Sequence, residues 1–552
     1  MQPADLQLSA ILIITPLFHL LFAPHTKVEE SFNLQAAHDI LVYGTPTHNV
    51  AARFASVYDH FTFPGAVPRS FIGAVVLSGL SQPLIWLSGF QHAQTIVRGT
   101  LGAFNVGCLL MLRQSLASAF GKGVARWWIL LQVTQFHVMY YLTRTLPNMY
   151  SFGLTTLAFA FILPKSNPAE SLRRRKQAIF FLTLSATVFR AETAILLVAI
   201  TLHLLLASQL TLRDVIPTFI LSFLFALVIS VPIDSYFWQQ WPLWPELAGF
   251  YFNAIKGSSS DWGVSSRHWY FTSALPRLFI NPLTPLLIVF ALYNAGTRRQ
   301  ALSLFVPSMA FVAVYSLQPH KETRFILYAV PPLTAVAALG ADYITTRASR
   351  TTANRLVTYA LYASLPLSLA ISSAMLVLSA LNYPGGEAIM HLHSLLPPSS
   401  ALDGPMYAHA DVLTCMTGLT LFHQNPHGLP LALANPDSAS PDERALLVVD
   451  KTERDITLGY PRFWERLDYA LEEKSALPMG DWEILGVVSG YDGIEILKPG
   501  QEEEKQQQPF DVLGLGRSVA EVRERTRALT GGWWVGPRMT PKINIMRRRD
   551  NV

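Results

Sequence analysis

The sequence predicts an all-α membrane protein that crosses the bilayer many times. The chain has 552 residues, of which 51% are hydrophobic and only 14% are charged, whereas soluble domains carry about 25% charged residues. Its mean hydropathy is +0.30, and apolar runs recur between short basic loops along most of its length. These observations exclude disordered, collagen-like and coiled-coil chains and argue strongly against an ordinary soluble enzyme.

The apolar runs predict about eleven transmembrane helices, although several are shorter than the roughly 20 residues that a straight span needs. The first run, Leu6–Phe22, lacks a basic n-region and a small-residue cleavage site, and it therefore indicates a signal anchor. The later runs are Gln94–Leu112, Trp127–Thr143, Tyr150–Leu163, Gln177–Phe189, Thr193–Ala207, Val215–Pro232, Thr272–Tyr293, Ala301–Leu317, Phe325–Ile344 and Leu356–Leu381.

A further apolar stretch, Val67–Phe90, is interrupted by prolines and glycines. If it does not span, the loops on one side of the bundle are all basic, including the block Arg173–Lys176, as expected of cytoplasmic loops. We therefore predict that Val67–Phe90 forms interfacial or re-entrant helices that pack against the bundle. The N-terminus is then cytoplasmic, and everything after Leu381 lies on the opposite side.

Neither the charge nor the cysteines indicate a nucleic-acid partner or a metal. The net charge of +5 is typical of a membrane protein that keeps Lys and Arg in its cytoplasmic loops. Cys108 lies in an apolar run, which argues against a disulfide with Cys415 and against a Cys-based metal site. The sequence contains no P-loop, no HExxH motif and no Asp-x-Asp pair, so we predict neither a cofactor nor a metal.

An acidic pair and a cationic cluster lie in the loops expected opposite the cytoplasm. Glu29 and Glu30 follow the first span directly, where adjacent carboxylates suit a general base, although a solvated acidic loop is the alternative. His320, Lys321 and Arg324 place three potential cations within five residues. Such a cluster suits an anion such as a phosphate, and its alternative is an anchoring cluster at a helix start.

Other polar and aromatic residues on this side are open to two interpretations. Arg190 and Glu192 are interpreted as a structural ion pair, with a functional role as the alternative. Tryptophans and tyrosines crowd the loop around Trp244 and Trp262, as in an interfacial aromatic belt or a sugar-stacking surface. An acidic pair and a cationic cluster that face one compartment fit an enzyme that transfers a sugar from a lipid phosphate. A transporter or scramblase of lipid-linked sugars would instead carry inverted repeats and intramembrane charges.

A series of motifs then resembles a known family. Together they closely resemble the dolichyl-phosphate-mannose-dependent α-1,6-mannosyltransferases of the endoplasmic reticulum, a branch of the polytopic family-22 glycosyltransferases with the C-type fold. The resemblance is strong over residues 1–390 and weak to about 497. The motifs are TKVEESFNLQAAHDIL, YDHFTFPGAVPRSF, TRTLPN, VFRAETAILL, IDSYFW, SSDWGVSSRHWYFTSALPR, HKETRFILYAVPPL and NYPGGEA. VEESFNLQ favours this branch over sister α-1,2-mannosyltransferases that act on the same glycan or on a GPI anchor and tend to carry Pro-Asp-Glu.

The resemblance implies an inverting transfer of mannose from dolichyl-phosphate mannose to lipid-linked Man7GlcNAc2-diphosphodolichol, in N-glycan precursor assembly. Inversion needs one general base. Glu29 occupies the position of the family's acidic base, and Glu30 would orient it or bind the acceptor. Because the family's Asp is replaced by the longer Glu29, Glu30 stays open as the base.

The same resemblance implies the remaining site residues and the setting. His320, Lys321 and Arg324 would hold the donor phosphate, assisted by Arg144, with no metal required. The partners would be the donor, the acceptor and membrane lipid, in the endoplasmic reticulum membrane with the active site in the lumen. Candidates for acceptor or sugar binding are Asp59, Asp234, Asp261, Trp262 and Trp269.

The composition changes after the NYPGG motif. We expect residues 1–382 to form the transmembrane catalytic domain and residues 383–497 a small lumenal α/β domain, for acceptor recognition or for stability. Apolar residues alternate at Ala445–Asp450 and Trp482–Leu497, where GYDG indicates a hairpin turn. Residues 498–552 are expected to be a low-complexity linker and a loosely ordered tail.

Overall fold

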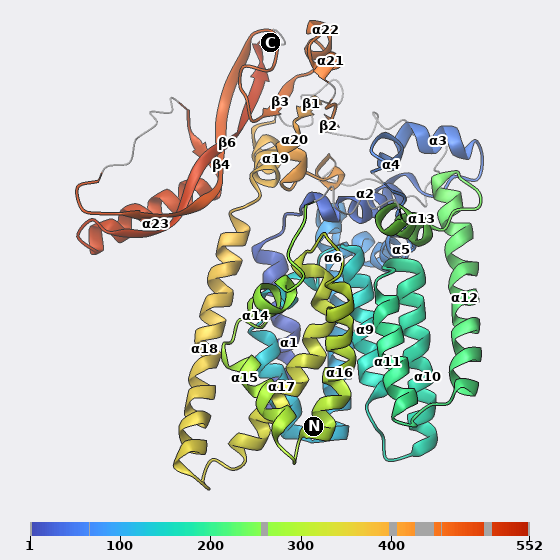
Figure 1. Ribbon diagram of the computed structural model, residues 1–552. Coiled ribbons are helices and arrows are strands. Elements are labelled where there is room, and N and C mark those ends of the chain that lie inside the picture. The colour runs from blue at the N-terminus through green and yellow to red at the C-terminus, as the bar shows by residue number, and fades with distance from the viewer. Residues whose placement is uncertain are drawn as a thin grey trace. The chain divides into compact units, whose positions relative to one another are not determined.

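The computed structural model describes residues 3–65, 67–255, 263–396, 406–424, 447–453, 455–501 and 510–549. Its contacts divide the chain into two units, each of which combines segments that are distant in sequence (Figure 1). The first unit comprises Met1–Leu21, His60–Leu77 and Val97–Met375, and the second comprises Phe22–Asp59, Ser78–Ile96 and Leu376–Val552.

The first unit is built from helices, because a chain in a bilayer has to satisfy its backbone hydrogen bonds within each segment. The α-helices that it contains or shares are α1 (Pro3–Phe22), α4 (Asp59–Thr62), α5 (Ile72–Ser88), α6 (Ala93–Phe120), α7 (Lys122–Val133), α8 (Phe136–Tyr141), α9 (Pro147–Ile162), α10 (Pro168–Leu184), α11 (Thr193–Leu206), α12 (Leu212–Trp238), α13 (Pro245–Phe250), α14 (Leu275–Phe279), α15 (Leu283–Tyr293), α16 (Arg298–Tyr315), α17 (Val330–Thr345) and α18 (Thr352–Ala380). Shorter 3-10 or π-helical turns are η2 (Ser185–Phe189), η3 (Tyr251–Ile255), η5 (Tyr270–Ala274) and η6 (Thr323–Ala329).

Several of these helices are suited to cross a membrane. Among the described residues, five helices are long and apolar enough, and a sixth crossing results if the bent pair Tyr270–Phe279 and Leu283–Tyr293 is one span. The five are Asp5–Phe22, Phe90–Phe120, Leu212–Trp238, Thr323–Thr345 and Thr352–Ala380. This confirms a helical membrane protein with many spans, but the number is lower than the expected eleven or so. Much of the difference is one of length, because several of the other apolar runs form helices that are too short for a straight span, such as α9 with 16 residues and α15 with 11.

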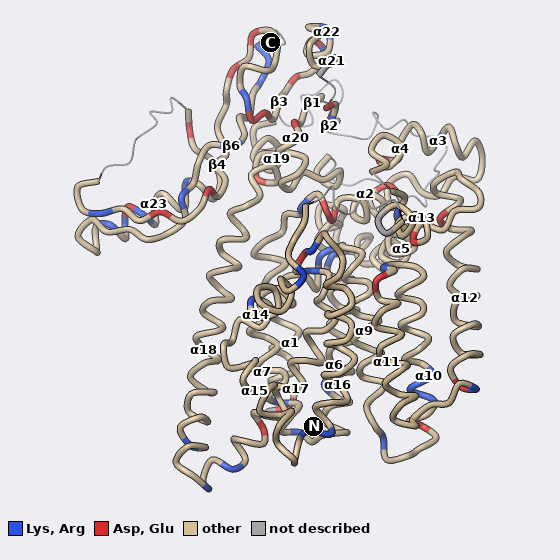
Figure 2. The backbone as a smooth tube through the Cα atoms, viewed as in Figure 1, with Lys and Arg blue, Asp and Glu red and all other residues tan. Residues whose placement is uncertain are grey.

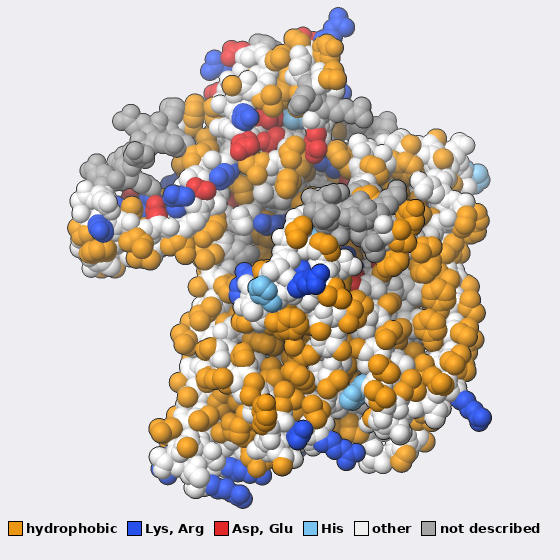
Figure 3. Space-filling view, in the orientation of Figure 1, with side chains coloured by type: hydrophobic (Ala, Val, Ile, Leu, Met, Phe, Trp, Pro, Cys, Tyr) orange, Lys and Arg blue, Asp and Glu red, His pale blue; other side chains and the backbone are white. Residues whose placement is uncertain are grey.

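The surface of the helical unit agrees with a membrane setting. Figure 3 shows apolar side chains covering most of its visible flank, and large side chains such as Leu221 and Val228 on α12 are well exposed. In Figure 2, Lys and Arg gather at the end of this unit where the N-terminus lies. Such a distribution matches the basic loops that the sequence places on one side.

The helix α5 occupies the ambiguous stretch Val67–Phe90. It has 17 residues with Pro83 inside it and belongs to the shorter apolar helices rather than to the candidate spans. Its interfacial position stays a prediction.

The second unit contains short helices and a sheet. The helices α2 (Val28–Tyr43) and α3 (Val50–Val57) follow α1, and the longer of the later helices are α19 (Pro384–Leu395) and α23 (Leu515–Leu529). Short helical turns are η1 (Phe90–His92), α20 (Val412–Met416), η8 (Leu421–Gln424), α21 (Asp455–Leu458) and α22 (Pro461–Trp464). In the part of the chain that the structure describes, six strands form one sheet in the order β2-β1-β3-β6-β4-β5. Their bounds are β1 (Met406–Ala410), β2 (Leu447–Asp450), β3 (Tyr469–Glu472), β4 (Trp482–Leu497), β5 (Val512–Leu513) and β6 (Trp534–Arg548).

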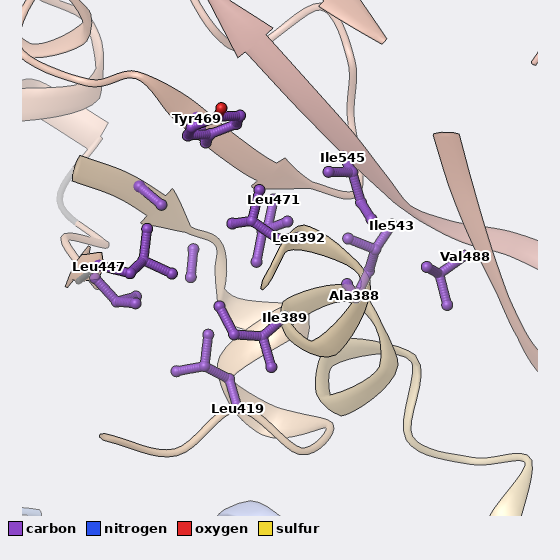
Figure 4. Packing of buried hydrophobic residues seen from close by; sticks show 13 residues of the cluster. Ala388, Ile389, Leu392, Leu419, Leu447, Tyr469, Leu471, Val488, Ile543 and Ile545 are labelled. Atoms are coloured by element: carbon purple, nitrogen blue, oxygen red, sulfur yellow. The ribbon is translucent and has the colours of Figure 1, made fainter. Parts of the chain in front are cut away.

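This sheet is mixed, and a helix covers part of one face. Strand β1 pairs in parallel with β2 and β3, whereas β6 pairs antiparallel with β3 and β4. Figure 4 shows Ile389 and Leu392 of α19 packed with Leu471 of β3 and Ile543 and Ile545 of β6. Burying this apolar surface is the main force that holds the sheet to the helix. The α/β character expected for the C-terminal part is confirmed.

Two details of the sheet differ from expectation. Strand β4 continues through GYDG, which forms a bulge opposite β6 between Tyr491 and Ile494 and not a hairpin turn. Within the segment expected to be a loosely ordered tail, residues 515–529 form α23 and residues 534–548 form β6, which lies between β3 and β4. The partners of β6 are distant in sequence, so no local pattern reveals the pairing.

Candidate active site

The acidic pair lies in the first turn of α2, in the second unit. Glu30 is buried, and its Oε1 accepts a hydrogen bond of 3.1 Å from the backbone N–H of Lys27. Glu30 therefore closes the start of the helix, where backbone N–H groups lack partners within the helix. Glu29 is half-buried in the same turn. The two carboxylates thus differ: the structure gives Glu30 a capping bond, and Glu29 takes no part in that bond.

Asp39, in the second half of α2, connects this helix to Asp59. Asp39 is fully buried, and its Oδ1 lies 3.0 Å from Nδ1 of His38. Its Oδ2 accepts a hydrogen bond of 2.8 Å from the backbone N–H of Asp59. Burial raises the pKa of Asp39, although the hydrogen bond from His38 opposes the shift. Asp59, a candidate for sugar binding, forms an ion pair with Lys451 through its Oδ1.

The cationic cluster lies in the first unit, in the loop that leads into η6. The Nε2 atom of His320 lies 3.2 Å from Oε1 of Glu322, and Nη2 of Arg324 donates to the same oxygen at 2.7 Å. Glu322 was not among the residues predicted from the sequence, and it orients two of the three cations in this loop. Its place inside HKETR, between two cations, is the sequence signal that could have found it.

Lys321 has a different environment in the same loop. Its side chain is buried, and Nζ donates to the backbone carbonyls of Gln318 and, at 3.1 Å, Ser265. Burial lowers the pKa of Lys321, and the nearby charge of Arg267 lowers it further. Lys321 thus joins the loop to the segment after residue 262 and adds positive charge beside His320 and Arg324.

A buried polar network lies next to this loop. Nε of Arg190 donates to Oε1 of Glu192 at 2.7 Å, and Nδ2 of Asn148 donates to the hydroxyl of Tyr328 at 2.9 Å. That hydroxyl lies 3.3 Å from the same oxygen of Glu192. The guanidinium groups of Arg190 and Arg324 lie 5.2 and 5.7 Å from the ring centroid of Phe325. The ion pair predicted between Arg190 and Glu192 is therefore present, and it borders the cationic loop.

Glu246 extends this network from α13. Its Oε2 accepts a hydrogen bond of 2.7 Å from the backbone N–H of Ala191. Burial raises the pKa of Glu246 to about 7, although the positive charge of Arg190 opposes the shift. Glu246 could not be selected from the sequence, because no local pattern indicates that α13 packs beside Arg190.

The remaining candidates occupy varied environments. Arg144 is buried with its guanidinium 4.0 Å from the ring centroid of Tyr140. Both carboxylate oxygens of Asp234 accept protein hydrogen bonds of 2.7 Å, from the backbone N–H of Phe71 and the hydroxyl of Ser230. These bonds satisfy both oxygens of the buried carboxylate, and a role of Asp234 in sugar binding stays a prediction.

The aromatic candidates are less informative. The ring of Trp269 lies 5.5 Å from the guanidinium of Arg277. Asp261 and Trp262 lie outside the described residues.

The structure therefore brings predicted residues together in two sets. His320, Lys321 and Arg324 are adjacent in the first unit, and Glu29 and Glu30 share one helical turn in the second. Among the residues that the structure describes, no group of three or more His, Cys, Asp or Glu side chains could hold a metal ion.

Comparisons with known proteins place these features in a family. The model of the Alg9-like mannosyltransferase family matches residues 9–394. A Saccharomyces cerevisiae protein named Dol-P-Man:Man(7)GlcNAc(2)-PP-Dol alpha-1,6-mannosyltransferase is 33% identical over 88% of both chains. An Arabidopsis thaliana protein of the same name is 35% identical over 73% of this chain and 78% of its own.

A solved structure supports the fold. The apo crystal structure of ArnT from Cupriavidus metallidurans superposes with a TM-score of 0.56, over 87% of this chain and 95% of that chain, at 14% identity. The helical membrane fold is therefore shared with ArnT. Since the family model covers more than half of the sequence and the Saccharomyces relative matches most of both chains, the protein belongs to the Alg9-like mannosyltransferase family.

Proposed function

We propose that this protein transfers mannose from dolichyl-phosphate mannose to the lipid-linked oligosaccharide Man7GlcNAc2-diphosphodolichol and forms an α-1,6 linkage. The observation that carries this proposal is the match to the Saccharomyces α-1,6-mannosyltransferase over 88% of both chains. A Danio rerio protein named GPI alpha-1,2-mannosyltransferase 3 matches only 38% of this chain. The sister α-1,2 reaction is accordingly the weaker candidate.

The cationic loop binds the donor phosphate in this proposal. Lys321 and Arg324 carry fixed positive charges, and Glu322 holds Arg324 and His320 in place. When the bond between C1 of mannose and the phosphate oxygen breaks, negative charge builds on the leaving dolichyl phosphate. Cations already in position stabilise that charge without reorganising. Arg144 assists, and Arg190 supports the loop through its contact with Phe325.

Glu29 acts as the general base. It takes the proton from the C6 hydroxyl of an acceptor mannose while that oxygen attacks C1 from the face opposite the phosphate. The β-linked donor thereby yields an α-linked product. Glu30 shapes the turn through its bond to Lys27 and orients its neighbour. The reverse assignment, with Glu30 as the base, is the alternative that the experiments below separate.

The proposed reaction also indicates the membrane in which the protein lies and its topology. We infer an endoplasmic reticulum membrane protein with about eleven crossings, in which helices such as α9, α11 and α15 complete the bundle that the longest helices begin. The N-terminus lies in the cytoplasm, and the active site and the C-terminal domain lie in the lumen. Residues 1–382 form the transmembrane catalytic domain and residues 383–497 form the lumenal domain, to which α23 and β6 from the following segment are added.

An assay with defined substrates tests this function. Purified protein is given dolichyl-phosphate mannose and lipid-linked acceptors of different sizes, and linkage-specific mannosidases identify the bond formed. We expect a single mannose added through an α-1,6 bond to the Man7 acceptor. An α-1,2 product would establish the sister reaction. Movement of the donor across vesicle membranes without a new bond would establish a transporter.

A further inference from the structure

Contacts within the second unit connect the end of strand β2 to helix α2, which carries Glu29. We propose that Lys451 is a positioning residue for the mannosyl transfer: through Asp59 and Asp39 it holds α2 in the orientation that Glu29 needs. The inference rests on the proposed role of Glu29, and it gives part of the C-terminal domain a place in the reaction itself.

The connection has three consecutive links. Lys451, the residue after β2, forms an ion pair with Oδ1 of Asp59, and both side chains are only 13% exposed. The backbone N–H of Asp59 donates to Oδ2 of Asp39 at 2.8 Å. Asp39 lies on α2, and its other oxygen lies 3.0 Å from Nδ1 of His38. Two residues that are 392 positions apart in the chain thus meet in one ion pair.

A second attachment lies on the same face of α2. Oε1 of Gln35 accepts a hydrogen bond of 3.1 Å from the backbone N–H of Leu421. The ring of His38 packs edge-on against Phe422, with ring centroids 5.2 Å apart. Gln35, His38 and Asp39 are spaced three and four residues apart, so they line one side of the helix. This side is therefore fastened to residues from the C-terminal domain.

The entry to α2 is fastened as well. A Cβ atom added to Gly386 would lie 2.2 Å from Nδ1 of His25, so the chain before α2 lies directly against the start of α19. Nζ of Lys27 lies 5.9 Å from the ring centroid of Tyr383. Because a helix rises 1.5 Å per residue, a shift at Asp39 is transmitted to Glu29 about 15 Å away by a nearly rigid rod.

Removing the lysine would disturb this arrangement for an electrostatic reason. The negative charge of Asp59 already acts on Asp39, and without Lys451 two poorly solvated carboxyl groups would face each other with one cation fewer. Their repulsion is relieved when Asp59 moves away from α2. A misplacement of about 1 Å at a reacting group can cost about a hundredfold in rate.

The test compares matched variants of the full-length enzyme. For Lys451→Met we expect turnover at saturating substrates to fall about tenfold to a hundredfold, with KM for the donor little changed. Amide hydrogen exchange in peptides of α2 should become faster. Lys451→Arg should retain most of the turnover, because the ion pair persists. The control is Arg466→Gln, which removes a cation paired with Asp450, one residue from Lys451, on an exposed surface.

A double-mutant comparison covers the case in which Lys451→Met does not fold. Asp59→Asn breaks the same ion pair, and the Lys451→Met/Asp59→Asn variant carries neither charge. If the pair acts as a unit, the double variant loses no more turnover than the Asp59→Asn variant alone. A double variant that loses clearly more turnover than Asp59→Asn alone would overturn the proposal. A folded Lys451→Met variant with wild-type turnover and wild-type exchange in α2 would overturn it as well. If exchange in α2 rises while Glu29→Gln stays fully active, the base assignment fails and the attachment of α2 stands.

Discussion

Replacing Glu29 by Gln should abolish most of the turnover without weakening the fold. The substitution keeps the shape of the side chain and removes its ability to take a proton, which typically contributes about 10²–10⁴-fold. That factor corresponds to about 3–5 kcal/mol of activation free energy. The thermal stability should stay close to that of the wild type, because Gln keeps the size and shape of the side chain and the bond that caps α2 comes from Glu30.

Glu30 should behave in the opposite way. Glu30→Gln keeps a carbonyl oxygen that can accept from the N–H of Lys27, so both stability and turnover should change little. Glu30→Ala removes the cap and should cost about 1 kcal/mol of unfolding free energy.

The assay measures turnover at saturating donor and acceptor, with thermal unfolding of each variant as the check on folding. A Glu30→Gln variant that is inactive but stable, beside an active Glu29→Gln variant, would reverse the two roles. If both Gln variants retain turnover, the base lies elsewhere. Because the two carboxylates are adjacent, the effects in a double variant need not add.

Three further outcomes are expected. Arg324→Ala should raise KM for the donor strongly, and Arg324→Lys should rescue it poorly because an ammonium lacks the two-pronged guanidinium; normal use of limiting donor by Arg324→Ala would contradict phosphate binding. Burial raises the pKa of Glu387 from 4.5 to about 7, so its stabilising contribution should be lost as pH rises from about 4.5 to about 7. Glu387→Gln can still accept the hydrogen bond from the backbone N–H of Leu515, but it cannot titrate, so its thermal stability should not show this loss with rising pH. Equal pH profiles of stability for the variant and the wild type would refute the prediction. A glycosylation acceptor engineered near Gly404 should be modified in microsomes, and one within Asn167–Ser171 should not; the reverse pattern would invert the topology.

Much of the fold could be predicted because it depends on composition and on local pattern. The helical membrane character follows from the scarcity of charge, and the C-terminal sheet follows from the apolar alternation in residues such as Trp482–Leu497. The number of crossings was harder, since a buried bundle accommodates helices such as α15, with 11 residues, that fall below the length of a straight span. The pairing of β6 with β3 and β4 depends on segments that carry no mutual signal in the sequence.

In the candidate site, too, local patterns predict some features, whereas contacts between distant segments could not be predicted. Glu29 and the HKETR loop could be selected because ionisable groups beside apolar runs are conspicuous. The separate environments of Glu29 and Glu30 could not be predicted, since they depend on which carboxylate caps α2. The ion pair of Asp59 with Lys451 could not be predicted either, because the two residues lie far apart in the sequence.

The place of β6 inside the sheet has a consequence for biosynthesis. Strands β3 and β4 emerge from the ribosome first, yet both hydrogen-bond to β6, which is made after them. Until residues 534–548 are translated, the two earlier strands expose unsatisfied edges of the kind that chaperones recognise and that promote aggregation. A premature stop codon just before Trp534 would leave every proposed catalytic side chain in the translated product, but it would divide the sheet in two. We therefore expect such truncated chains to be retained by quality control and degraded.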